Sequence, residues 1–117
     1  MATLIPFDGS AQQAIEQVRY GQGCLVTAIY GDKNSFLKEI IMGLAAWNGR
    51  LVIVDEQVSH QSLHPGLVTP QLLHGGPGRA GGGSELGGVR GLHLYQQRCA
   101  LQGNGPKIAR LIYTPPE

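Results

Sequence analysis

The chain has few charges, few cysteines and no long apolar run, and each shortage excludes a class of protein. Asp, Glu, Lys and Arg make up 15% of its 117 residues, and the net charge is +1. A dedicated nucleic-acid binder usually carries a basic patch, so that class is disfavoured. The two cysteines, Cys24 and Cys99, are too few for a disulfide framework. Without an apolar run of roughly 18 residues or the basic start of a signal peptide, the sequence predicts a cytoplasmic protein of one domain.

Glycine, by contrast, is abundant and concentrated in one stretch. Nine of the 18 glycines lie between His74 and Gly91. Because glycine loses much conformational freedom on folding, such a run indicates a loop shaped for close backbone contact. Residues 76–81 match G-x-G-x-x-G, but neither a preceding strand nor a later acidic residue supports a dinucleotide site. Apolar residues three or four apart then predict a third helix: Leu86, Val89, Leu92, Tyr95 and Cys99.

Upstream of this loop, the pattern alternates between strand and helix. Residues 2–7 form a short apolar run that Pro6 confines to an edge strand or the end of a strand. An S-x-x-Q capping box at Ser10 then starts a helix that reaches about residue 19. Residues 24–30 are apolar on both faces and predict a covered strand. A second helix over about residues 34–48 precedes a strand over residues 51–54. This β-α-β-α-β order predicts an α/β fold with an open, mostly parallel sheet.

The remaining segments lack such alternation. Residues 55–83 show no periodicity, and a stretch of this length in a compact domain predicts an ordered functional loop on the surface. Ala109 to Tyr113 favours a C-terminal strand that stops at Pro115. We therefore divide the chain into residues 1–103 and a tail, residues 104–117, with an oligomerisation strand.

The loop and its flanks resemble a known family. Pro70 to Gly83, PQLLHGGPGRAGGG, is followed by Glu85-Leu86-Gly87-Gly88 and Gln97-Arg98. Together these segments resemble the catalytic domain of NAD(P)-dependent aldehyde dehydrogenases. They are most similar to the semialdehyde dehydrogenases of phenylacetate and benzoate degradation through CoA thioesters. The resemblance covers at least residues 2–103 and implies the C-terminal part of that domain.

The resemblance implies a dehydrogenase fragment that is inactive alone, because the segments that carry the nucleophile and bind NAD(P) are absent. No catalytic, cofactor-binding or metal residue is expected in this chain; NAD(P) belongs to the full-length relatives. The resemblance also implies a small aldehyde or CoA thioester as substrate, and a homo-oligomer joined through sheet edges. The residues expected to line the substrate entrance or brace the loop are Asp55, Glu56, His74, Gly75, Gly76, Gly78 and Arg79.

Other residues echo functional sites without the required context. Glu85 and Cys99 copy a base and nucleophile pair, but both follow the glycine loop and stand too close in sequence. We therefore expect Cys99 to be a small apolar packing residue. His60 and His64 have metal-ligand spacing but no third ligand. The alternative function is a stand-alone module that self-associates or binds an anion or nucleotide.

Overall fold

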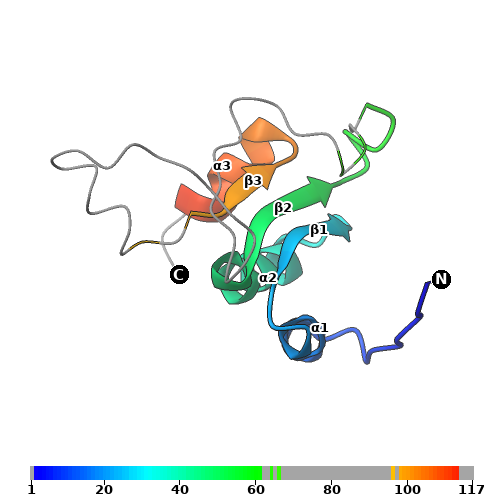
Figure 1. The fold of residues 1–117 in the computed structure, drawn as a ribbon. Helices are drawn as coiled ribbons and strands as arrows, with labels where there is room; N and C mark the ends of the chain where they lie inside the picture. The colour runs from blue at the N-terminus through cyan, green and yellow to red at the C-terminus, as the bar shows by residue number, and fades with distance from the viewer. Residues whose placement is uncertain (1, 62–63, 65, 67–95, 97, 114–117) are drawn as a thin grey trace, which may run out of the picture.

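The computed structural model describes residues 2–61, 64, 66, 96 and 98–113 (Figure 1). In this part of the chain, three strands form one parallel sheet in the order β1-β2-β3. Three α-helices and one short 3-10 helix accompany them. The elements are α1 (Ala11–Tyr20), β1 (Cys24–Tyr30), α2 (Asn34–Leu44), η1 (Ala45–Trp47), β2 (Asn48–Val54), β3 (Ala100–Gln102) and α3 (Gly105–Tyr113). The prediction of an α/β fold with an open parallel sheet is confirmed.

The start of α1 shows how the sequence fixes local structure. The Ser10 hydroxyl accepts a hydrogen bond from the Gln13 backbone N–H at 3.2 Å, as the S-x-x-Q pattern predicts. The return contact differs from a capping box, because the Gln13 side chain accepts from the Asp8 N–H at 2.5 Å. Asp8 in turn accepts from the Ser10 N–H at 2.7 Å. Hydrogen bonds from the Ser10 side chain, and then from its backbone, lower the pKa of Asp8. The chain before α1 is thus tied to the helix by side chains.

Several predicted boundaries change in the structure. β1 has the predicted bounds, but β2 begins at Asn48, because η1 ends the second helix and leads directly into the strand. The strand predicted over residues 2–7 is wrong: those residues have no regular structure and are exposed. The predicted third helix and the glycine-rich loop lie almost wholly outside the described residues. Cys99, its last predicted residue, lies just before β3 rather than in a helix.

The predicted C-terminal strand is also wrong, because Ala109 to Tyr113 belong to α3. The Asn104 side chain accepts from the Lys107 N–H at 3.1 Å, and its carbonyl accepts from the Ile108 N–H at 2.9 Å. Asn104 therefore caps the helix. Pro106 is tolerated in the first turn, where the missing N–H has no partner within the helix. Over residues 104–113, the part of this tail that the structure describes, the chain therefore forms a helix and contains no strand.

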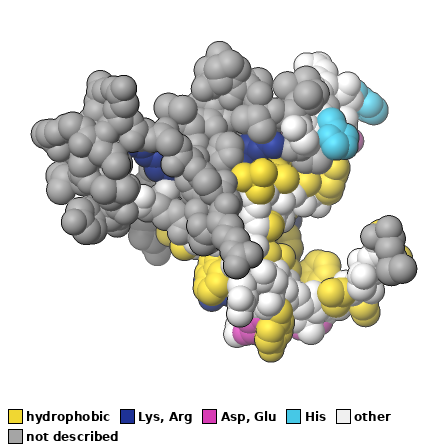
Figure 2. Space-filling model, viewed as in Figure 1, with side chains coloured by type: hydrophobic (Ala, Val, Ile, Leu, Met, Phe, Trp, Pro, Cys, Tyr) yellow, Lys and Arg dark blue, Asp and Glu magenta, His cyan; other side chains and the backbone are white. Residues whose placement is uncertain are grey.

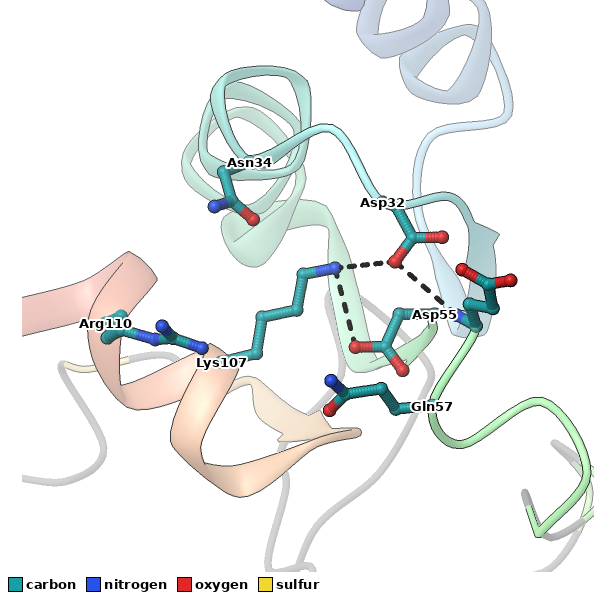
Figure 3. Close-up of a pocket in the computed structure, with 7 residues that line it drawn as sticks. Asp32, Asn34, Asp55, Gln57, Lys107 and Arg110 are labelled. Carbon is teal, nitrogen blue, oxygen red and sulfur yellow. Dashed lines mark hydrogen bonds and ion pairs between the residues drawn. The ribbon is translucent and has the colours of Figure 1, made fainter.

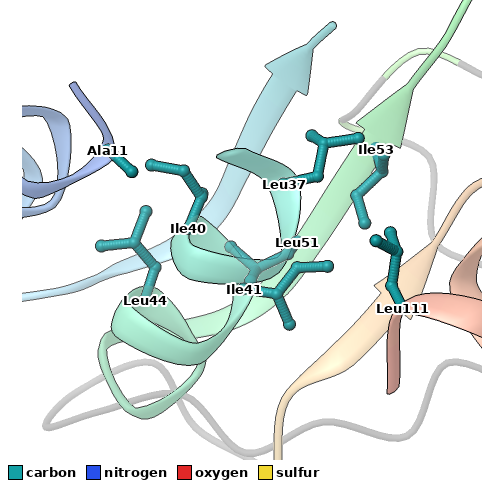
Figure 4. Close-up of a cluster of buried hydrophobic side chains, with 8 residues drawn as sticks. All are labelled: Ala11, Leu37, Ile40, Ile41, Leu44, Leu51, Ile53 and Leu111. Atoms are coloured by element: carbon teal, nitrogen blue, oxygen red, sulfur yellow. The ribbon is translucent and has the colours of Figure 1, made fainter. Parts of the chain in front are cut away.

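The main core lies between the helices and one face of the sheet (Figure 4). Leu51 and Ile53 point to this face, since residues two apart in a strand share a side. The helical side chains of the cluster come mainly from α2, with one each from α1 and α3: Ala11, Leu37, Ile40, Ile41, Leu44 and Leu111. α2 therefore connects the other two helices to the central strand.

The central strand β2 is buried along its whole length. On the face opposite Leu51 and Ile53, the buried residues include Arg50 and Val52. The Arg50 guanidinium donates to the Gln102 side chain at 2.9 Å, so a polar contact joins β2 to β3 on this face. A buried arginine is tolerated because its donors are satisfied.

α1 and α2 approach each other closely at Gly43. A Cβ at this position would lie 2.8 Å from Ile15 Cγ1, so the missing side chain makes room for α1. Arg19 donates to the Gly43 carbonyl at 2.8 Å, and its guanidinium lies 5.5 Å from the centre of the Trp47 ring. This cation–π contact adds to the attachment of α1.

Several large hydrophobic side chains remain at the surface. Figure 2 shows hydrophobic side chains, in yellow, exposed on the face in view. They include Leu25 and Tyr30 in β1, Met42 in α2 and Tyr113 in α3. Among the described helices, none has the length and apolarity needed to cross a membrane.

The position of α2 in the core predicts a large effect of one substitution. Leu37 is fully buried, so Leu37→Ala should lower the free energy of unfolding by about 2–5 kcal/mol through lost burial and a residual cavity. Met42 lies on the same helix but is 76% exposed, so Met42→Ala should have little effect. Urea denaturation followed by circular dichroism measures both, and equal losses would contradict the core described above.

Candidate functional site

A polar cleft lies where the carboxyl ends of the parallel strands meet the start of α2 and α3 (Figure 3). Open α/β sheets bind ligands at this edge, outside the carboxyl ends of the strands. The cleft has a volume of about 270 Å³. Its lining combines carboxylate, amide and basic groups: Asp32, Asn34, Asp55, Glu56, Gln57, Lys107 and Arg110.

The strand ends bring the acidic side chains together. Tyr30 pairs with Val54 in the last registered position of β1 and β2. The Gly31 N–H then donates to the Val54 carbonyl at 3.1 Å, which keeps the two chains aligned beyond the strands. Asp32 and Asp55 follow directly, so both carboxylates come to the same edge of the sheet.

Lys107 of α3 lies between these two carboxylates. Its Nζ is 3.0 Å from Asp32 Oδ1 and 3.4 Å from Asp55 Oδ2. The Lys107 side chain is 13% exposed and that of Asp55 only 2%, whereas that of Asp32 is 58% exposed. Removing the Asp55 carboxylate from water costs free energy, and the ammonium group of Lys107 compensates this desolvation cost. Asp55 Oδ1 also accepts from the Val58 N–H at 3.0 Å.

Asp32 has a shifted pKa with a clear cause. The hydrogen bond from Lys107 lowers the pKa of Asp32, and a hydrogen bond from the Glu56 N–H at 3.4 Å acts in the same direction. Partial burial opposes the shift. Because the lysine contact stabilises the charged form, Asp32 is a carboxylate at neutral pH.

Two further contacts fix the start of α3, and therefore the lysine. The Asn104 amide donates to the Gln57 side chain, which joins the turn after β2 to the cap of α3. Gly103 lies against the backbone of β2: a Cβ there would be 2.6 Å from the Ile53 carbonyl oxygen. Only a residue without a side chain allows this approach, so Gly103 contributes to placing Lys107 over the strand ends.

Sequence reasoning identified only part of this cleft. Asp55 and Glu56, expected at a substrate entrance, do line it. The other expected residues, His74, Gly75, Gly76, Gly78 and Arg79, lie outside the described residues.

Asp32 and the α3 residues of the cleft were missed. Asp32 directly precedes Lys33, the N-cap residue of α2, which makes no side-chain capping hydrogen bond. Lys107 and Arg110 were missed because the tail was predicted as a strand. Asn104 followed by Pro106 is the signal that could have indicated a helix start.

The residues that echo other sites do not form one in the described part of the chain. Cys99 packs half-buried against the core cluster, and burial raises the pKa of its thiol, opposed by a hydrogen bond from the Leu51 N–H. This environment favours the neutral thiol over a nucleophilic thiolate. His60 and His64 are both described, and no cluster of three metal-ligating side chains occurs within the described ranges. Glu85 lies outside them.

Comparison with known proteins identifies two relatives. The chain is similar to Protein MaoC of Klebsiella aerogenes, with 41% identity over 111 residues, which are 95% of this chain and 33% of that protein. It is also similar to 3,4-dehydroadipyl-CoA semialdehyde dehydrogenase of Aromatoleum evansii, with 36% identity over 77 residues, which are 66% of this chain and 15% of that protein. The chain therefore spans a third or less of either relative. No family model and no solved structure matches it.

These matches correct the interpretation of the glycine-rich loop. The prediction of an aldehyde dehydrogenase catalytic domain is wrong, because the similarity that runs along 95% of the chain, at the higher identity, is to Protein MaoC. The match to the semialdehyde dehydrogenase is shorter and covers 15% of that protein, so its activity is not carried over. Three predictions that depended on that domain are therefore also wrong: the dehydrogenase fragment, its oxidoreductase chemistry and its role in aromatic degradation. The chain is therefore similar, over most of its length, to one part of Protein MaoC, and its described residues have an α/β fold.

The buried ion pair predicts a strong effect of removing the lysine. Lys107→Met should lower the free energy of unfolding by about 3 kcal/mol, because Asp55 then loses its counter-charge. The value lies at the low end of the range for buried pairs because Asp32 faces solvent. Lys33→Met removes the same charge from an exposed position and is the matched control. Urea denaturation at neutral pH measures the free energy of unfolding of both variants. Equal values would contradict the stabilising ion pairs of Lys107 with Asp32 and Asp55.

The lowered pKa of Asp32 predicts a pH dependence. Since the folded pKa lies below the ordinary value of 3.8, the stabilisation is complete above that value and is lost as pH falls through the folded pKa. Asp32→Asn should therefore be less stable than the parent at neutral pH, and the difference should shrink as the pH falls below 3.8. Denaturation curves over this range measure the difference. A gap that is constant with pH would show that ionisation of Asp32 contributes nothing.

The two thiols should differ in reactivity. Cys24 is exposed, whereas Cys99 is half-buried and its pKa is raised by burial. A disulfide reagent such as DTNB should label Cys24 in a fast phase and Cys99 in a slow one. Cys24→Ser should abolish the fast phase, and Cys99→Ala only the slow one. Loss of the fast phase in Cys99→Ala would contradict this assignment.

Proposed function

We propose that this chain is a ligand-binding segment of a longer MaoC-like polypeptide in the cytoplasm, and that the cleft around Lys107 holds the ligand. The observation that carries the proposal is the convergence of Asp32, Asp55 and Lys107 at the carboxyl edge of the sheet. Their side chains reach the cleft from three different elements or turns, so the site depends on the tertiary fold. Because the chain spans about a third of Protein MaoC, any reaction is assigned to the longer polypeptide.

The charges of the cleft favour a particular kind of ligand. Three acidic side chains, Asp32, Asp55 and Glu56, line it beside two basic ones, Lys107 and Arg110. This excess of negative charge disfavours a phosphate group. Carboxylates accept hydrogen bonds, and the amides of residues 34 and 57 both donate and accept. The lining therefore suits an uncharged ligand that carries hydroxyl and amide groups.

The pantetheine arm of a CoA thioester has this chemistry, with hydroxyl and amide groups and no phosphate. The cleft, at about 270 Å³, is slightly smaller than the pockets of roughly 300 Å³ and above that enclose a whole ligand. It can accordingly hold one segment of a larger molecule. The name of the Aromatoleum evansii relative contains a CoA thioester, which supports this choice of ligand. In this proposal the phosphates of CoA stay outside the cleft.

Calorimetric titration tests the proposal. Pantetheine and CoA should bind with dissociation constants that agree within about threefold, whereas adenosine 3′,5′-bisphosphate should give no heat of binding. Asn34→Ala should weaken pantetheine at least tenfold, about 1.4 kcal/mol, without unfolding the protein, because Asn34 is exposed. Glu39→Gln, on α2 but outside the cleft lining, should leave binding unchanged. Binding of the bisphosphate alone, or of no ligand, would overturn the proposal.

A further inference from the structure

The ammonium group of Lys107 has more hydrogen-bond donors than its neighbours use. Nζ is 3.0 Å from Asp32 Oδ1 and 3.4 Å from Asp55 Oδ2, and these carboxylates are its only acceptors among the described residues. An ammonium group carries three N–H donors. Two acceptors leave one donor over, and Lys107 belongs to the lining of the cleft. This donor can therefore reach a ligand that enters the cleft.

The position of the ammonium group is fixed before a ligand arrives. Figure 3 shows the Lys107 side chain extending from α3 towards the two carboxylates. The Lys107 N–H is bonded to the Asn104 side chain, which fixes the first turn of α3. The carboxylate of Asp55 is buried and anchors the ammonium group from the end of β2. A donor that is already positioned loses little side-chain entropy when a ligand binds.

The charges around this donor favour a neutral acceptor. Asp32 and Asp55 together carry one negative charge more than the ammonium group that they contact. The carboxylate of Glu56 also lines the cleft. An anionic acceptor would add a further negative charge beside these groups, and like charges repel. A carbonyl oxygen accepts the same hydrogen bond without adding a net charge.

We propose that Lys107 recognises an amide carbonyl oxygen of the ligand, and that Asp32 sets the preference for this neutral acceptor over an anionic one. The inference rests on the proposed binding of pantetheine and adds the group of the ligand that is recognised. Lys107 is the residue that contacts the ligand. Asp32 acts through Lys107, so it is a positioning residue that also determines specificity.

Two ligands that differ in one group test this preference. Pantothenamide ends in a neutral primary amide, and pantothenate ends in a carboxylate at the same place. Calorimetric titration of the parent protein at neutral pH should show pantothenamide binding roughly tenfold more tightly, because like charges in contact are unfavourable.

A variant with one charge fewer tests the role of Asp32. Asp32→Asn leaves two acidic and two basic side chains in the lining, so the ratio of the two affinities should fall below about threefold. Asp32 is mostly exposed, so this variant retains the buried pair of Lys107 and Asp55. Glu39→Gln removes a carboxylate outside the lining and should keep the ratio of the parent protein.

The contact of Lys107 with the ligand can be measured without a substitution at this position. The chain contains three lysines: Lys33, Lys38 and Lys107. Saturating pantothenamide should slow the acetylation of Lys107 by acetic anhydride several-fold, as followed by mass spectrometry of peptides. Lys33 and Lys38 do not line the cleft, so their rates should stay the same and serve as internal controls.

The outcomes separate this inference from the proposed function. Three results would overturn the inference alone, provided that pantetheine binds: no preference for pantothenamide, a preference unchanged in Asp32→Asn, or acetylation of Lys107 that the ligand does not slow. If neither pantetheine nor pantothenamide binds, the proposed function falls together with the inference.

Discussion

The placement of a nearly inaccessible carboxyl group at the end of the central strand is the constraint on which much of the structure depends. Asp55 is 2% exposed and cannot hold a charge there without compensation. Compensation comes from Lys107, more than fifty positions further along the chain, so α3 must dock at the strand ends for the charge to be accepted. Two residues support this docking: Asn104 caps α3, and Gly103, which has no side chain, lies close to the backbone of β2. One electrostatic requirement thus explains why the last helix has a defined place on the sheet.

The first half of the fold could be predicted because its signals are local. The capping serine, the strand CLVTAIY and the apolar spacing of α2 each depend on residues within one element. β3 has only three residues and forms through pairing with Arg50, Leu51 and Val52. No local hydrophobic periodicity therefore predicts this strand. α3 was mistaken for a strand because Leu111, Ile112 and Tyr113 are good strand formers. Its cap and its packing against the core outweigh that propensity.

The residues of the cleft, too, could be predicted only in part from the sequence. Asp55 and Glu56 were expected at a substrate entrance only because of the resemblance to a dehydrogenase, and both line the cleft. The bridge to Lys107 is a tertiary contact that no spacing in the sequence encodes. The resemblance to a family rested mainly on the glycine-rich loop, and the similarity to Protein MaoC over 111 residues corrects it. A short motif, even one of unusual composition, is thus a weaker guide than similarity across 95% of a chain.

The spacing of the strands along the chain has a consequence for the order of folding. Partners in β1 and β2, such as Cys24 and Asn48, are 24 positions apart, whereas Arg50 and its partner Ala100 in β3 are 50 apart. Closing a loop twice as long costs only about 0.6 kcal/mol more in entropy, but the three residues of β3 give little return until α3 also packs. The helices and strands up to Val54 can therefore assemble as an early nucleus, with β3 and α3 added as one unit. In that sequence of events, Asp55 stays hydrated until the final step and then loses its water as Lys107 arrives.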